Sequence, residues 1–94
     1  MELNAFVNSI GYDGNSAIVD KAAFSANKGK NIEQLLKEGA FRAAAAYAVH
    51  TDNADGLQKV ADAYNGIAGA SYKKEHMYRL FGVSKAEVKK TLFL

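Results

Sequence analysis

Residues 31–49 read NIEQLLKEGAFRAAAAYAV, and this stretch decides the fold that the sequence predicts. Asn31, followed three positions later by Gln34, matches the capping box that starts many helices. The apolar side chains then fall on two opposite faces of one helix. One face carries Ile32, Leu35, Leu36, Ala40, Ala43 and Tyr47, and the other carries Phe41, Ala45 and Ala48. We therefore expect a central helix whose small Ala side chains allow close packing on both sides, and which Gly39 kinks or divides in two.

The segments on either side of this stretch continue the helical pattern. The residues that follow the loop over residues 50–53 predict an amphipathic helix that is capped by Thr51 or Asp52. Its apolar stripe is the most regular of the chain and consists of Leu57, Val60, Ala61, Tyr64, Ile67 and Ala68. Near the start of the chain, the spacing of Leu3, Phe6, Val7 and Ile10 predicts a short first helix.

Residues 16–27 leave two alternatives open, helix and strand. Asp13-Gly14 is a typical hairpin turn, and residues 17–19, Ala-Ile-Val, resemble a strand. Residues 20–24, Asp-Lys-Ala-Ala-Phe, favour a helix instead. Because polar and apolar residues alternate only briefly around the turn, we favour a helix over residues 16–27 with Asn15 or Ser16 as its cap, although the sequence does not decide the matter.

Residues 71–94 are expected to form two further helices. Ser71 caps the first helix, which carries Met77, Leu80 and Phe81 on its apolar side, and Gly82 ends it. The second helix is expected to start at Ser84 and to run to the end of the chain. Its start signal is a capping box of Ser84 and Glu87, together with a hydrophobic staple between Val83 and Val88.

Residues 77–90 resemble the helix-turn-helix of DNA-binding proteins. Gly82, Val83, Ser84 and Val88 match that motif, whereas Tyr78 and Thr91 depart from it. The resemblance implies a recognition helix whose Lys85, Lys89 and Lys90 face phosphates. Capping of two ordinary helices explains the same residues, and we favour that interpretation. The predicted fold is thus all-α: a compact bundle of about five short helices in one helical domain over residues 1–94, with a helix-turn-helix-like C-terminal corner.

The residue types argue against catalysis. The chain has 94 residues, no Cys and two His, His50 and His76, with no zinc, nucleotide-binding or triad motif around them. Thr51 and Asp62 stand where a calcium loop needs Asp and Glu, so an ordinary capped loop explains residues 51–62 better. No apolar run approaches a membrane span and no secretory signal is seen. We therefore expect a small, soluble, cytoplasmic protein that is not an enzyme and has no cofactor, no metal and no small-molecule substrate.

The charge distribution points to the end of the chain. Residues 72–94 carry six basic and two acidic side chains, a formal charge of +4 against +2 for the whole chain, and such asymmetry indicates an anionic partner. Tyr72 and Tyr78 lie among these charges, where they either cover other helices or form a contact surface. The candidate binding residues are Lys73, Lys74, Tyr78, Arg79, Lys85, Lys89 and Lys90. The expected function is a protein-binding module, such as an adaptor, inhibitor or accessory subunit; the alternative is DNA binding through residues 72–92.

Overall fold

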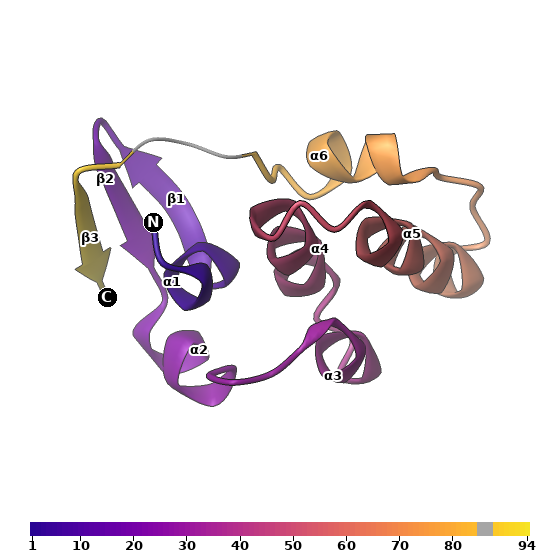
Figure 1. Ribbon diagram of the computed structural model, residues 1–94, viewed down its shortest axis with the longest axis horizontal. Helices are drawn as coiled ribbons and strands as arrows, with labels where there is room; N and C mark the ends of the chain where they lie inside the picture. Colours follow the sequence, from indigo (N-terminus) through magenta and orange to yellow (C-terminus); the bar gives the residue numbers. More distant parts are fainter. Residues whose placement is uncertain (85–87) are drawn as a thin grey trace.

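The computed structural model describes residues 1–84 and 88–94, and it contains helices and a small β-sheet (Figure 1). In chain order the elements are α1 (Leu3–Val7), β1 (Ser9–Asp13), β2 (Ser16–Val19), α2 (Lys21–Ala26), α3 (Ile32–Lys37), α4 (Phe41–His50), α5 (Ala54–Ala68), the 3₁₀ helix η1 (Lys74–His76), α6 (Met77–Leu80) and β3 (Lys90–Phe93). The fold is therefore α+β, and the prediction of an all-α bundle is wrong.

The Ala-rich helix α4 lies at the centre of the helical part and packs against α1, α3 and α5 (Figure 1). Ala44 and Ala45 have no exposed surface, which follows from their small size and from contacts on two sides. Residues 31–49 form two helices because Gly39 adopts a φ of +75°. In this conformation the N–H of Ala40 donates to the carbonyl of Leu35 at 2.9 Å, the bond that closes a Schellman motif. The predicted capping box of Asn31 and Gln34 is confirmed, with both bonds at 2.9 Å.

Helix α5 has its N-cap just after the two positions expected for it. Asn53 is the N-cap and accepts a hydrogen bond from the N–H of Gly56 at 2.9 Å, whereas the Thr51 hydroxyl donates back to Tyr47 at the end of α4. Glycine fits at position 56 because a Cβ atom would lie 2.7 Å from Cδ1 of Ile32 on α3. The apolar stripe is buried only in its first half: Leu57 is 4% exposed, and Ile67 is 76% exposed.

Residues 9–19 form a β-hairpin with the typical turn Asp13-Gly14, which is the alternative to the helix favoured for residues 16–27. Strands β1 and β2 pair antiparallel around Gly14, whose φ is +59°, and a bulge interrupts β1 between Ser9 and Gly11. The helix expected over residues 16–27 is wrong for residues 16–19, and α2 begins only at Lys21 with Asp20 as its N-cap. Ala17 and Val19 are fully buried on one face of β2, so burial in a sheet overrides the helical tendency of the following residues.

Strand β3 corrects the prediction for the end of the chain. It pairs parallel to β2, so the sheet order is β1-β2-β3, and residues 88–94 contain no helix. The helix-turn-helix-like corner is therefore wrong. Gly82, with a φ of +61°, ends α6 as predicted, and Val83 is buried, but no recognition helix follows in residues 88–94. Lys85 and Glu87, the proposed phosphate contact and capping-box partner, lie outside the described residues.

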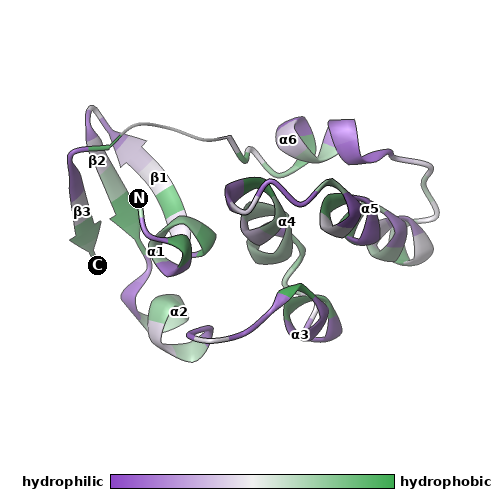
Figure 2. Ribbon diagram, in the orientation of Figure 1, coloured by the Kyte–Doolittle hydropathy of each residue, from purple (hydrophilic) through white to green (hydrophobic). Residues whose placement is uncertain are grey.

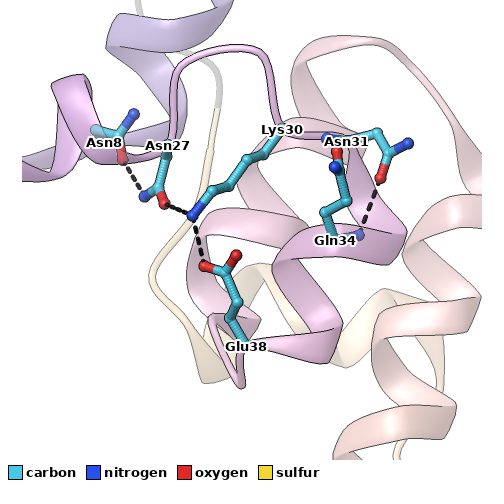
Figure 3. Close-up of polar contacts among 6 residues, drawn as sticks. All are labelled: Asn8, Asn27, Lys30, Asn31, Gln34 and Glu38. Atoms are coloured by element: carbon cyan, nitrogen blue, oxygen red, sulfur yellow. Dashed lines mark hydrogen bonds and ion pairs between the residues drawn. The ribbon is translucent and has the colours of Figure 1, made fainter.

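Two polar links join the sheet side of the molecule to the helices. The guanidinium of Arg42 on α4 donates to the carbonyl of Ser9 at 2.6 Å and to the carbonyl of Phe81 at 3.1 Å. Figure 3 shows the second link, in which Asn27 donates to the Oδ1 atom of Asn8 at 2.8 Å and Lys30 reaches the Glu38 carboxylate at 2.7 Å. These contacts fix the loop between α2 and α3 against α1 and the end of α3.

Candidate protein-binding surface

The predicted binding residues fall into two groups that lie at opposite ends of the molecule. Lys73, Lys74, Tyr78 and Arg79 belong to η1, α6 and the residue before them, at the right of Figure 1. Lys89 and Lys90 lie beside the β-hairpin turn at the left, where both N–H groups donate to the carbonyl of Asn15. Lys85 lies outside the described residues. The basic residues of the described ranges 72–84 and 88–94 therefore do not form one site.

The first group stands on a backbone that side chains of α5 hold in place. The Asn65 amide accepts from the N–H of Tyr72 at 2.9 Å and donates to the Tyr72 carbonyl at 2.8 Å. Two turns earlier on α5, the Gln58 side chain accepts from the N–H of Lys74 at 3.2 Å. Within the segment, Nδ1 of His76 accepts from the N–H of Lys73 at 2.9 Å. These bonds position residues 72–76 although most of their side chains are exposed.

An aromatic cluster lies beneath this segment. The Tyr64 ring on α5 contacts the rings of Phe41 and Phe81 edge to face, both with centroids 5.5 Å apart, and the Tyr72 ring at 5.9 Å. Tyr72 in turn contacts the His76 ring at 5.8 Å. Such aromatic pairs contribute about 0.5–1.5 kcal/mol each beyond the area they bury. The cluster thus joins α4, α5 and the C-terminal end of α6, and it supports Tyr72 from below.

The outer side of the segment forms a shallow hollow of about 630 Å³ that is lined by Tyr72, Glu75, His76, Arg79 and Leu80. We call these residues together with Tyr78 the Tyr72–Leu80 surface. Large side chains are open to solvent here: Tyr72 is 37% exposed, Tyr78 47% and Leu80 36%. Tyr78 and Lys74 also line a smaller hollow of about 190 Å³ against α4 and α5. The surface therefore combines aromatic, aliphatic and cationic groups on a positioned backbone.

Two residues of this surface, Tyr78 and Arg79, are among the candidates that the sequence indicated. The sequence leaves Tyr72 open between packing and contact, and it places Leu80 on an apolar helix face. Met77 lies in the core and is fully buried, whereas Leu80, the last residue of the four-residue helix α6, is 36% exposed. Glu75 and His76 were not candidates. The helix expected from Ser71 begins only at Lys74, as the 3₁₀ turn η1, and Glu75 and His76 lie in that turn.

The two histidines have structural roles. Nε2 of His50 lies 2.7 Å from the carbonyl of Met1, and its ring packs against Phe6 with centroids 5.3 Å apart. His76 uses Nδ1 to hold Lys73, as described above. Within residues 1–84 and 88–94, no group of three His, Cys, Asp or Glu side chains could hold a metal ion. His50 thus holds the start of the chain, and His76 holds the backbone of Lys73.

One exposed ion pair shifts the pKa values of its members. Lys59 on α5 lies 2.9 Å from the Glu33 carboxylate on α3. The hydrogen bond and charge of Lys59 lower the pKa of Glu33, and the same contact raises the pKa of Lys59. Both side chains are largely exposed, so the pair links α3 to α5 at the surface.

Comparison of the chain with protein-family models, with curated proteins and with solved structures finds no significant match in any of the three. None of the helices in the described part of the chain is both long and apolar enough to cross a membrane. Function is therefore inferred from the geometry of the chain itself.

Proposed function

We propose that this chain is a small, non-catalytic protein-binding module, acting as an adaptor, inhibitor or accessory subunit, and that its contact surface is the Tyr72–Leu80 surface. One observation carries the proposal: Tyr72, Tyr78 and Leu80 are exposed on a segment whose backbone is held by Asn65 and Gln58. Tyr and Arg are enriched at protein interfaces and dominate their hot spots. A backbone that is positioned before binding also reduces the conformational entropy that association must overcome.

The charges of the segment indicate the kind of protein that fits. Lys73, Lys74 and Arg79 outnumber Glu75, so a partner surface with excess Asp or Glu would be attracted and oriented by it. Exposed charges of this kind act mainly on the association rate and weaken as salt rises. The rings of Tyr72 and Tyr78 would then supply the desolvated contact area. The cytoplasmic location expected from the sequence belongs to the same proposal.

Affinity capture with matched variants tests the proposal. Tagged wild-type protein, Tyr78→Ala, Arg79→Ala and the control Ile67→Ala are compared in extracts of the native host, with the captured proteins quantified by mass spectrometry. Ile67 is a suitable control because it is more exposed than Tyr78 and lies on α5. We expect a captured protein that is reduced at least about tenfold by Tyr78→Ala and by Arg79→Ala, the size of a modest hot spot. If every captured protein survives both changes, the surface is not the binding site.

Nucleic acid remains the alternative partner, but no specific observation favours it. The recognition helix on which it depended is absent from residues 88–94, and the basic residues are divided between two ends. Titration of duplex DNA at two salt concentrations separates the alternatives. Binding driven by phosphate contacts falls steeply with salt, by orders of magnitude for several contacts. Binding that is tight at low salt, and is lost when Lys73 and Lys74 are changed to Glu, would favour DNA over a protein partner.

A further inference from the structure

The central strand β2 is fully buried on one face of the sheet and partly exposed on the other. Because directly paired residues on neighbouring strands point to the same side, the register defines the rows of each face. Ala17 and Val19 of β2 have no exposed surface and mark the buried face. On the other face, one row consists of Gly11, Ile18 and Leu92, and the next row consists of Asp13, Ser16 and Lys90. Ile18 is partly exposed and Leu92 is 45% exposed on this face, whereas Phe93, the partner of Val19 on the buried face, is 48% exposed. We call this side the open face.

The open face is complementary to a copy of itself. A two-fold axis parallel to the central strand β2 exchanges β1 of one copy with β3 of the other across the interface. In this arrangement Asp13 of one copy faces Lys90 of the second copy, and the reverse pair forms at the other edge. Ile18 packs against Ile18 of the second copy at the axis. Leu92 is placed over Gly11 of the second copy, where the missing side chain leaves room for it.

The open space around Gly11 supports this packing. A Cβ atom built on Gly11 meets no atom within 4 Å, and its φ lies outside the left-handed region, so neither a steric contact nor the backbone conformation requires glycine there. Glycine inside a strand often marks a bulge, such as the one between Ser9 and Gly11, or a place where another group approaches closely. We propose that a second copy of this chain packs on the open face, with Leu92 of each copy over Gly11 of the other.

The size of the face sets the strength expected. The register places only two residues of each strand on the open face, so the interface is small and the association should be weak and transient. The dimer should therefore form at high protein concentration or where the chain is locally concentrated. It does not depend on the Tyr72–Leu80 surface, which lies at the other end of the molecule (Figure 1), so the two proposals can fail separately.

The first test replaces Gly11. The full chain is studied by sedimentation equilibrium up to about 1 mM, the range in which weak complexes are measured. Wild-type protein should show a reversible monomer–dimer equilibrium. Gly11→Val fills the space needed by Leu92 of the second copy and should weaken the dimer at least about fivefold, while thermal unfolding of the dilute monomer stays unchanged or improves. Ile67→Ser, which removes an exposed apolar side chain from α5, serves as the control and should associate as the wild type does.

The second test uses the charges and is specific to the two-fold arrangement. Asp13→Lys alone sets two lysine side chains against each other across the interface, and Lys90→Glu alone sets two carboxylates against each other. Each variant should therefore be weakened at least about fivefold as a homodimer. In an equimolar mixture, a heterodimer of the two variants has opposite charges at both edges, and the mixture should recover the wild-type association.

Three results would overturn the proposal. The first is a wild type that stays monomeric at about 1 mM. The second is a dimer that Gly11→Val leaves intact, because Leu92 of the second copy then has no need of the space above Gly11. The third is a mixture of Asp13→Lys and Lys90→Glu that fails to recover association, because the two-fold arrangement requires that the two variants complement each other.

Discussion

The side-chain amide of Asn65 forms two hydrogen bonds with the backbone of Tyr72, accepting from its N–H at 2.9 Å and donating to its carbonyl at 2.8 Å. The Asn65 amide thus makes the two backbone hydrogen bonds to Tyr72 that a neighbouring β-strand would otherwise make. The pairing fixes Tyr72 above the aromatic cluster around Tyr64. The contact surface proposed for this chain depends on that fixation, since the segment before η1 has no regular secondary structure of its own.

Asn65→Ala should loosen the Tyr72–Leu80 surface. The change removes both hydrogen bonds, but water can replace them because Tyr72 is partly exposed, so the free energy of unfolding should fall by about 1–2 kcal/mol. The amide hydrogens of Tyr72 and Lys74 should exchange faster with solvent, whereas those in the middle of α4 should not change. Hydrogen-exchange NMR measures both effects. Unchanged protection at Tyr72 would mean that the Asn65 pairing does not hold the segment.

Leu57→Ala and Ile67→Ala should differ strongly in stability although both residues lie on the same predicted stripe of α5. Leu57 is 4% exposed, and its truncation should cost about 2–5 kcal/mol through lost burial and the cavity left behind. Ile67 is 76% exposed, and its truncation should change stability by less than about 0.5 kcal/mol. Urea unfolding monitored by circular dichroism compares the two variants. Equal costs would contradict the position of α5 in the fold.

The Glu33–Lys59 pair should contribute to stability only within a defined pH range. The lowered pKa of Glu33 means that its contribution is present above its ordinary value of 4.5 and is lost as the pH falls through the lowered value. The raised pKa of Lys59 means that its contribution is present below 10.5 and is lost as the pH rises through the raised value. Denaturant unfolding of wild type and Glu33→Gln between these limits should show a constant difference.

That difference should shrink at lower pH and at high salt, because both side chains are largely exposed. Lys30 and Glu38 form a separate ion pair between the end of α3 and the preceding loop. Glu38→Gln removes that pair and leaves the Glu33–Lys59 pair intact, so it serves as the control variant. A difference between wild type and Glu33→Gln that grows as the pH falls below 4.5 would have the wrong sign for a stabilising contact of the ionised carboxylate.

The contrast between residues 31–49 and residues 9–19 explains what the sequence could predict. The cap formed by Asn31 and Gln34 and the break at Gly39 depend on neighbours within four positions, so their patterns can be read locally. Strand β2 has only four residues, and its parallel partner begins at Lys90. Figure 2 shows hydrophobic residues on β2 and β3 as well as on the helices, so hydropathy alone does not distinguish them. Non-local pairing decides the sheet.

For the candidate surface, too, the local signals could be read from the sequence and the non-local arrangement could not. Tyr72, Tyr78 and Arg79 stand out because aromatic and basic residues gather near the chain end. The separation of Lys89 and Lys90 from them was not predictable, because it depends on β3 returning to the hairpin at the far end of the molecule. A helix in that place would have kept the basic residues together, which is why the wrong secondary structure also gave the wrong shape of site.

Site-specific photo-crosslinking tests the central claim most directly. A photoreactive amino acid is placed at Leu80 on the Tyr72–Leu80 surface, and in a second protein at Ile67 on α5; both positions are exposed, so the fold should tolerate both changes. The proteins are irradiated in cells of the native host, and crosslinked products are identified by mass spectrometry. The account predicts a defined protein crosslinked from position 80, absent from position 67, and lost when Arg79 is also changed to Ala. Equal crosslinking from both positions, or none from position 80, would contradict the account.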